Sequence, residues 1–194
     1  MPDIALFPLQ TVLYPGGRLP LRIFEPRYLD MVSRCLKNEQ GFGVCLIAEG
    51  AETGAARTHN LGTLAQIRDW STGPEGLLHI LAVGEKRFRV QEMRTEHDGL
   101  NTATVEWLAN EPAIPVPASA GTLVQLLRQI LEQVANRDAG VPTDFDDASW
   151  VGYRLAEVLP ISLKQRQYLL ELSDAAKRLE ILTTLVESLA METE

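Results

Sequence analysis

The period of the hydrophobic positions changes near the middle of the chain. Up to about residue 108, short apolar segments are separated by turn residues, and in several of them the apolar positions recur every second residue. Beyond residue 119, apolar positions recur every three or four residues. The pattern therefore predicts an α+β protein with a β-rich first lobe and a helical second lobe.

The first lobe reads as many short strands. Turn residues at 14–17, 73–76 and 96–99 supply glycine and proline between apolar segments, and the polar stretch 49–60 is typical of a surface loop. Many short strands at this spacing favour a small barrel or sandwich over a parallel sheet. The strands are predicted at 4–7, 18–23, 42–48, 61–70, 77–83, 86–92 and 100–107.

One helix is predicted inside this β-rich lobe. Pro26 suits a first helical position, and Leu29, Val32 and Leu36 follow at helical spacing until 38–41 ends the run.

A proline-rich segment separates the two patterns. Pro112, Pro115 and Pro117 disfavour a helix and leave too few donors for the interior of a sheet. We therefore expect a β-rich lobe at 1–110, a linker at 111–118 and a helical bundle at 119–194. A length of 194 residues fits one large domain or two small ones.

Helix signals divide the second lobe into four helices. Apolar residues from Leu123 onwards predict the first, which Gly140 and Pro142 end. The N-caps predicted for the other three are Asp146 or Asp147, then Ser162 in a capping box with Gln165, then Asp174.

Composition and charge limit the partners. The first ten residues have no basic segment typical of a secretory signal, and no apolar stretch approaches the ~20 residues that cross a bilayer. With Cys35 and Cys45 expected as reduced core thiols, we predict a cytoplasmic protein without a membrane partner. The net charge of −8 disfavours general binding to nucleic acid.

The chain lacks the motifs of several enzyme classes. The sequence contains no G-x-x-x-x-G-K-[ST], no G-x-G-x-x-G and no G-x-S-x-G. His59, His79 and His97 are not spaced as zinc ligands usually are, and the acidic residues at 144–147 suit a solvated loop that caps a helix. We therefore expect no catalytic residues, no metal and no cofactor.

The basic segment at 86–89 suggests an alternative function. Its alternation predicts a half-exposed strand with Phe88 and Val90 on the inner face and Arg87 and Arg89 on the outer one. A basic strand of this kind could contact RNA, although Phe88 cannot stack on a base from the inner face. An RNA-binding domain is therefore the alternative prediction.

Several segments together resemble the Lon protease N-terminal domain family over nearly the whole chain. The clearest are the segments around Phe7-Pro8-Leu9, Val12 to Gly16, Leu19 to Glu25, Gly62 to Ala65 and Val83 to Val90, followed by the helical segment at 169–182. The resemblance implies a PUA-like β lobe with a helical bundle. In full-length Lon proteases this region helps to recognise unfolded polypeptides, whereas the ATPase and the Ser-Lys peptidase lie further along the chain.

This resemblance implies a non-catalytic module that binds unfolded or exposed polypeptide segments, with a protease or chaperone as a further partner. Such binding needs an exposed apolar surface or a free strand edge. Aromatic residues at strand ends or turns are expected to stay partly accessible, and Arg27 could pair with a carbonyl or carboxylate. The candidate binding residues are Tyr14, Phe24, Arg27, Tyr28 and Trp70.

Overall fold

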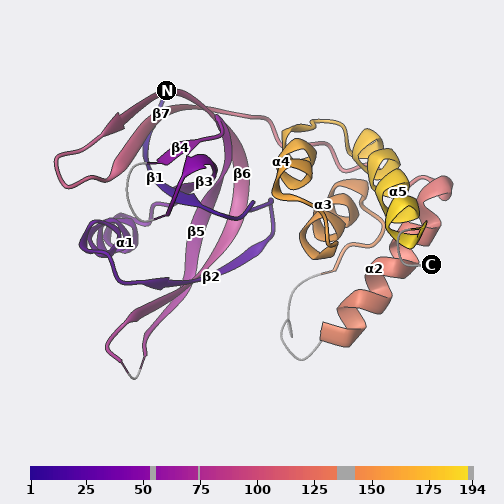
Figure 1. Cartoon of the computed structure of the whole chain (residues 1–194), viewed down its shortest axis with the longest axis horizontal. Coiled ribbons are helices and arrows are strands. Elements are labelled where there is room, and N and C mark those ends of the chain that lie inside the picture. Colours follow the sequence, from indigo (N-terminus) through magenta and orange to yellow (C-terminus); the bar gives the residue numbers. More distant parts are fainter. Residues whose placement is uncertain (53–55, 74, 135–142, 192–194) are drawn as a thin grey trace. The chain divides into compact units, whose positions relative to one another are not determined.

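The computed structural model describes residues 1–52, 56–73, 75–134 and 143–191. The chain forms two compact units, Met1–Asn110 (unit 1) and Glu111–Glu194 (unit 2), which are described separately here (Figure 1). Strands lie in unit 1 and most helices in unit 2, so the predicted mixed fold is confirmed. Pro74 in the predicted turn, and Gly140 and Pro142 at the predicted helix end, lie outside the described residues.

Unit 1 is built on a sheet that closes on itself. Strands β1, β7, β6, β5 and β3 are neighbours in that order, and β1 also pairs in parallel with β3 (Figure 1). Strand β2 pairs with β6, and β4 pairs with β3, outside this ring. The strands are β1 (Asp3–Leu9), β2 (Arg18–Ile23), β3 (Phe42–Gly50), β4 (Ala56–Thr58), β5 (Leu61–Thr72), β6 (Leu78–Thr95) and β7 (Asn101–Trp107).

Strand β6 is longer than the sequence pattern predicts. The segments predicted as two strands, at 77–83 and 86–92, form one strand through Gly84. Gly84 donates to Gly17 O (2.9 Å) and accepts from Gly16 N (2.8 Å), while a Cβ at this position would lie 2.2 Å from Tyr14 O. Gly84 therefore allows two backbones to approach closely and does not break the strand. The predicted loop at 49–60 likewise contains the short strand β4.

The interior of the closed sheet is filled by one aromatic ring. Phe88 is fully buried with Leu6, Cys45, Ala103 and Val105. Two residues beside it must be glycine, because an added Cβ at 43 or at 62 would lie 2.6 or 2.8 Å from Phe88 Cζ. The sequence thus leaves room for a large ring inside a narrow barrel.

Helix α1 (Pro26–Asn38) covers a second, larger core of unit 1. The helix begins with proline at its first turn, as predicted, and Tyr28, Met31, Val32 and Cys35 form its buried face. These residues pack on the inner faces of β1, β2, β5 and β6.

Unit 2 consists of helices whose N-caps match the sequence signals. Asp147 Oδ2 accepts from Trp150 N (3.0 Å), Ser162 and Gln165 form the capping box, and Asp174 Oδ1 accepts from Lys177 N (3.0 Å). The helices are α2 (Gly121–Val134), α3 (Ala148–Val158), α4 (Leu163–Glu171) and α5 (Ala175–Met191), preceded by the short 3₁₀ helix η1 (Ala118–Ala120).

The proline-rich segment expected as a linker is held within unit 2. Val116 N donates to Asp146 O (3.0 Å), and Ala148 N donates to Ile114 O (2.9 Å). Pro115 forms an isolated bridge with Asp147. Residues 111–118 are thus fastened to the start of α3 through backbone hydrogen bonds that need no regular strand.

A buried arginine joins the helices of unit 2. Arg178 on α5 is fully buried, and its guanidinium binds both carboxylate oxygens of Glu111, with Nη1 to Oε2 at 2.8 Å. The same group donates to the carbonyls of Leu169 (3.0 Å) and Leu172 (2.7 Å) and lies over the ring of Tyr153. Glu111 also accepts from Tyr153 Oη (2.7 Å) and Ser149 Oγ (2.8 Å).

These contacts set the ionisation of Glu111. Burial acts to raise the pKa of Glu111, but the hydrogen bonds and charge of Arg178, with the hydroxyls of Tyr153 and Ser149, outweigh it. The pKa of Glu111 therefore lies below its usual 4.5, and the carboxylate stays charged in the folded protein.

Removing one partner of this buried pair should destabilise unit 2. In Arg178→Met the carboxylate of Glu111 would stay buried but lose the positive charge of Arg178, and breaking a buried ion pair in this way typically costs about 3 to 5 kcal/mol. We expect that loss in urea denaturation followed by circular dichroism of the helices. Lys177→Met, which removes an exposed neighbouring charge, should change stability by less than about 0.5 kcal/mol. Equal stability of the two variants would contradict the role assigned to Arg178.

Acid should weaken unit 2 through Glu111. Because the pKa of Glu111 is lower in the folded than in the unfolded chain, its stabilising contribution is complete above 4.5 and is lost as the pH falls through the folded value. We expect the melting temperature of the wild type to fall more steeply below pH 4.5 than that of Glu111→Gln. The variant should be the less stable protein at neutral pH. Parallel pH profiles of the two proteins would contradict the assignment.

Candidate functional site

The five candidate binding residues differ widely in exposure. Phe24 is 60% exposed and Trp70 58%, whereas Tyr14 and Tyr28 are buried at 0% and 4%. The prediction that aromatic residues at strand ends stay accessible is confirmed for Phe24 and Trp70 and is wrong for the two tyrosines. Their participation in binding as a set of five remains a prediction.

Tyr14 and Tyr28 are buried because they close unit 1. Tyr14 lies in the turn before β2, where its carbonyl accepts from Gly17 N (2.9 Å). Tyr28 is on the inner face of α1 and stacks on Phe7 with ring centroids 4.0 Å apart, and burial raises the pKa of its hydroxyl. The sequence contained a signal for Tyr28, since positions 28, 31, 32 and 35 share one helical face.

Arg27 binds groups of its own chain. Its Nη1 donates to Gly99 O (2.8 Å), in the turn between β6 and β7, and its Nη2 forms an ion pair with Glu25 (2.8 Å). The guanidinium also lies over the ring of Tyr28. Arg27 therefore fixes the first turn of α1 against the barrel, which makes it a structural residue in this conformation.

An apolar seam runs along one flank of α1. Leu29 and Leu36, which are 37% and 38% exposed, lie seven positions apart on the same side of the helix. Leu36 lines a common hollow with Ile67 of β5. Leu29 lies about two turns earlier on the same flank of the helix.

Strand pairing places Trp70 beside this seam. Trp70 is opposite Ile80 of β6, which in turn is opposite Leu21 of β2, so the three side chains share the face that α1 covers. Trp70 is nevertheless 58% exposed, and β3 pairs with β5 only at residues 63–65, away from Trp70. We define the α1 seam as Leu29, Leu36, Ile67 and Trp70, with Phe24 at the start of the helix.

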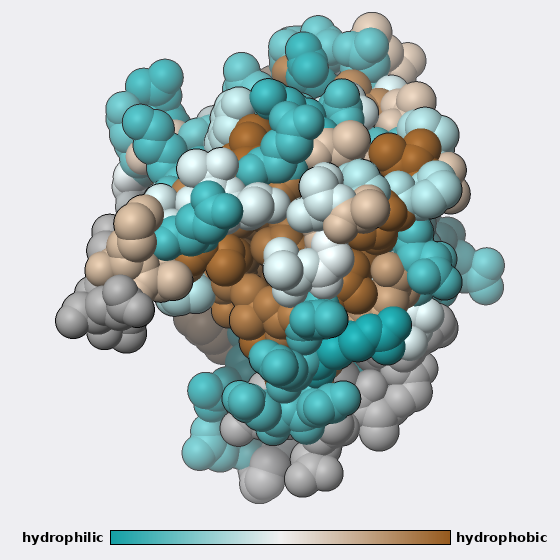
Figure 2. Space-filling view, turned by 90° about the vertical axis from the view of Figure 1, so that its right-hand side faces the viewer, coloured by the Kyte–Doolittle hydropathy of each residue, from teal (hydrophilic) through white to brown (hydrophobic). Residues whose placement is uncertain are grey.

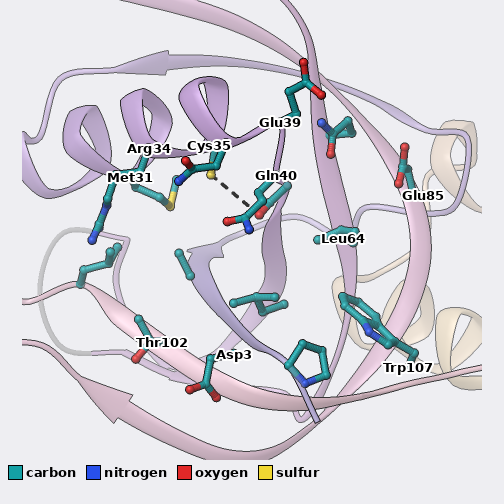
Figure 3. Close-up of a pocket in the computed structure, with 17 residues that line it drawn as sticks. Asp3, Met31, Arg34, Cys35, Glu39, Gln40, Leu64, Glu85, Thr102 and Trp107 are labelled. Atoms are coloured by element: carbon teal, nitrogen blue, oxygen red, sulfur yellow. Dashed lines mark hydrogen bonds between the residues drawn. The ribbon is translucent and has the colours of Figure 1, made fainter.

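A hollow of about 520 Å³ lies beside the opposite flank of α1 (Figure 3). Met31, Arg34 and Cys35 of the helix form one wall, and residues 3–5 of β1 form another. A second hollow of about 510 Å³ continues towards the α1 seam. The two share five lining residues around the C-terminal end of α1, namely Cys35, Glu39, Gln40, Gln66 and Glu85.

The hollow exists because the chain leaves α1 abruptly. Glu39 adopts a left-handed conformation with φ 53°, and Gln40 N donates to Cys35 O (2.9 Å) to close the helix. Gly41 then passes β5 so closely that a Cβ would lie 2.6 Å from Ala65 O. The chain therefore joins β3 at Phe42 and leaves the space beside residues 3–5 unfilled.

The cysteines do not supply reactive groups to this hollow. Cys35 Sγ donates to Gly41 O at 3.8 Å, as Figure 3 shows, and burial raises the pKa of its thiol. Cys45 is completely buried, which raises its pKa to about 12. Both thiols are free, protonated and packed in the core, as predicted from the sequence.

The basic strand differs from its predicted arrangement. Arg87 is only 3% exposed, although the alternation placed it on an outer face with Arg89. At this point β6 pairs with β5 through Arg87 and Thr63, and Leu108 N donates to Arg87 O (3.0 Å). Lys86 lies over the ring of Trp107 at 4.1 Å. The exposed pair of arginines on which the RNA-binding alternative rests is therefore absent.

Among the residues that the structure describes, no three His, Cys, Asp or Glu side chains are grouped so that they could hold a metal ion. None of the helices in these ranges has the length and apolar character needed to cross a bilayer.

Unit 2 carries an apolar surface of a different kind. Figure 2 shows apolar side chains gathered at the centre of a face of the helical unit, with polar side chains around them. The partly exposed apolar residues of α2 and α5 include Leu126, Ile130, Leu131, Leu185, Val186 and Leu189. The described part of unit 2 offers no strand edge there, so the candidate site is assigned to unit 1.

A comparison with protein families gives one match over nearly the whole chain. Residues 3–188 match the family described as the ATP-dependent protease La (LON) substrate-binding domain. A similar solved structure is that of a Lon N-terminal domain protein from Xanthomonas campestris. It has a TM-score of 0.81 and 37% identity over 95% of this chain and 98% of that one.

Full-length relatives are similar in part of their length. Lon protease from Xanthomonas oryzae pv. oryzae is 24% identical over 95% of this chain and 23% of its own length. Protein cereblon from Gallus gallus is 32% identical over 62% of this chain and 27% of its own length. The chain thus spans about a quarter of the length of these relatives.

The difference in burial among the aromatic residues can be tested by substitution. We expect Trp70→Ser and Phe24→Ser to change the free energy of unfolding by less than about 0.5 kcal/mol, because both side chains are exposed. Tyr28→Ala should cost about 3 to 5 kcal/mol, since it leaves a cavity against Phe7. Chemical denaturation measures both. A large loss in Trp70→Ser would show that its ring is covered in solution.

Proposed function

Because the chain belongs to the family of ATP-dependent protease La (LON) substrate-binding domains, we propose that it binds unfolded or exposed polypeptide segments along the α1 seam of unit 1. The observation that carries this proposal is the exposure of Phe24, Trp70, Leu29 and Leu36 around one helix. In this proposal unit 1 recognises the polypeptide and contributes no catalytic group.

Exposed apolar side chains of this size favour a polypeptide as the ligand. Contiguous apolar surface on a folded protein marks interaction sites, and aromatic anchors supply much of the binding energy at such sites. An unfolded polypeptide offers scattered apolar side chains that a folded protein keeps buried. The α1 seam would therefore bind the unfolded form of a protein and not its folded form, because only the unfolded form exposes those apolar side chains.

The dimensions of the seam suit an extended segment. Leu29 and Leu36 are separated by about 10 Å along the helix axis, at 1.5 Å per residue. Ile67 and Trp70 are separated by about 10 Å along β5, at roughly 3.3 Å per residue. A polypeptide lying in this seam would place about three residues between apolar walls.

The relatives support the same role. Lon protease and cereblon share parts of this chain and continue far beyond it, so the common part is a module that long proteins of different names contain. The family description names substrate binding as the function of the matched domain. We extend that function to this chain.

A binding assay with a permanently unfolded protein tests the proposal. The probe is a fluorescently labelled model protein whose disulfides have been reduced and carboxymethylated, and the same protein in its native, disulfide-bonded form is the reference. We expect saturable binding to the unfolded form alone. Trp70→Ser should weaken binding by about 2 kcal/mol, roughly thirtyfold in Kd, as expected for an aromatic anchor.

A matched control distinguishes binding at the α1 seam from nonspecific hydrophobic binding. Met93 is 40% exposed on the part of β6 that pairs with β7, away from α1, so Met93→Ser should leave the Kd unchanged. Equal affinity for the folded and unfolded forms would contradict the proposal. So would equal losses in the Met93 and Trp70 variants.

A further inference from the structure

The strands of unit 1 leave several edges unpaired, and two of them are blocked. Gly17 forms a hydrogen-bonded pair with Gly84, and bonded and non-bonded pairs alternate along the ladder between β2 and β6. Residues 19 and 21 therefore direct their main-chain groups towards β6, and Pro20 directs its own towards the unpaired edge of β2. Proline has no N–H to offer there. On β5 the N–H of Trp70 is taken by Asp69 Oδ1 at 2.8 Å. Both features oppose the addition of another strand.

The edge of β1 differs from these two. Val105 N donates to Pro2 O (3.0 Å), so Pro2 and Val105 form a hydrogen-bonded pair of the antiparallel ladder between β1 and β7. Bonded and non-bonded pairs alternate in such a ladder. Ile4 therefore bonds to Ala103, while Asp3 and Ala5 direct their main-chain groups away from β7.

On the side away from β7, no described strand lies beside Asp3 or beside the N–H of Ala5. The parallel ladder with β3 begins at the pair of Leu6 and Gly43, because the chain before Phe42 turns back towards α1. Within the described ranges, no backbone hydrogen bond joins Asp3 or Ala5 to residues 40 and 41. The N–H and C=O of Asp3 and the N–H of Ala5 therefore remain open, and both residues line the hollow beside α1 (Figure 3).

We propose that this edge of β1 takes up an extended polypeptide segment as an added strand inside the hollow, an inference that rests on the proposed function and specifies how the backbone is recognised. The segment occupies the place that β3 vacates at Gly41. Main-chain hydrogen bonds to Asp3 and Ala5 hold it, so that recognition depends little on the sequence of the polypeptide.

The hollow suits such an occupant in size and chemistry. A volume of about 520 Å³ lies within the ~300 to 1,000 Å³ typical of ligand sites. Met31, Leu64 and Leu100 supply apolar contacts, whereas Arg34 and Glu39 bring opposite charges to its rim. Alternate side chains of an extended segment point to opposite faces, so apolar residues would meet the floor and polar ones the rim.

Amide exchange of two neighbouring residues provides the central test. In the free protein the Ala5 amide should exchange fast and the Ile4 amide slowly, because only Ile4 bonds to β7. The probe is an eight-residue peptide of alternating Val and Thr or Lys. On its addition the Ala5 amide should become at least tenfold more protected, with no change at Ile4, as followed by NMR.

Peptide chemistry gives a second measurement that needs no protein variant. The same peptide carrying N-methyl groups on three consecutive central residues keeps its side chains but loses those donors. We expect its affinity to fall at least tenfold. If the methylated peptide binds as tightly as the parent and the Ala5 amide stays unprotected, strand addition is wrong.

Proline substitution gives a matched pair of variants. Ala5→Pro removes an N–H from the open edge and no ladder bond, so the protein should fold and bind the probe at least tenfold more weakly. Ile4→Pro removes a bond to Ala103 and should lower the melting temperature. A folded Ala5→Pro protein with unchanged affinity would overturn the proposal, and the exchange and methylation measurements decide it if the variant does not fold.

The outcomes also separate this inference from the proposed function. If Trp70→Ser weakens binding of the unfolded model protein while the Ala5 amide stays unprotected, the α1 seam binds polypeptides and the β1 edge does not. If neither the unfolded protein nor the peptide binds at all, both proposals fail.

Discussion

The parallel pairing of β1 with β3 is the constraint on which unit 1 depends. It joins the first and last members of a twisted sheet and so turns that sheet into a closed barrel around Phe88. The pairing begins only at Leu6 and Gly43, because the preceding chain has to turn out of α1. The pairing of β1 with β3 therefore closes the barrel but leaves the first residues of β1 without a partner strand. The hollow beside β1 is a consequence of how the barrel closes.

Helix α1 separates two surfaces with different properties. On one flank, Leu29 and Leu36 are partly exposed, and Leu36 shares a hollow with Ile67 of β5; these residues and Trp70 make up the α1 seam. On the other flank, Arg34 and the unpaired edge of β1 form a hollow that offers main-chain hydrogen bonds. Both meet at the C-terminal end of the helix.

Unit 2 depends on a polar interaction inside an apolar bundle. Arg178 binds Glu111 and two helix-terminal carbonyls, and it thereby connects the segment that enters the unit with α4 and α5. A buried ion pair of this kind adds less net stability than an apolar replacement can, but losing one partner is costly. Its effect is to fix which segments pack together. It anchors residues 111–118 at Glu111, and backbone hydrogen bonds of Ile114 and Val116 hold the rest of the segment to the start of α3.

The sequence by itself determined the local structure. Helical spacing located α1, although two of the three positions that indicated it, Leu29 and Leu36, are partly exposed and only Val32 is buried. The side chains of Asp147, Ser162 and Asp174 marked helix starts within a residue or two. These signals are readable because a cap or a helical face depends on residues within one or two turns. The family resemblance likewise rests on short segments whose order along the chain is visible in the sequence.

The tertiary structure alone decided what the site is made of. Nothing local distinguishes buried Tyr14 from exposed Trp70, since burial depends on which distant strand or helix lies above the ring. Arg87 was expected outside because alternation describes one strand, whereas its burial depends on parts of the fold that the strand's own residues do not reveal. The open edge of β1 is also invisible in sequence, because a missing partner is a property of the ladder and not of the residues Asp3 and Ala5.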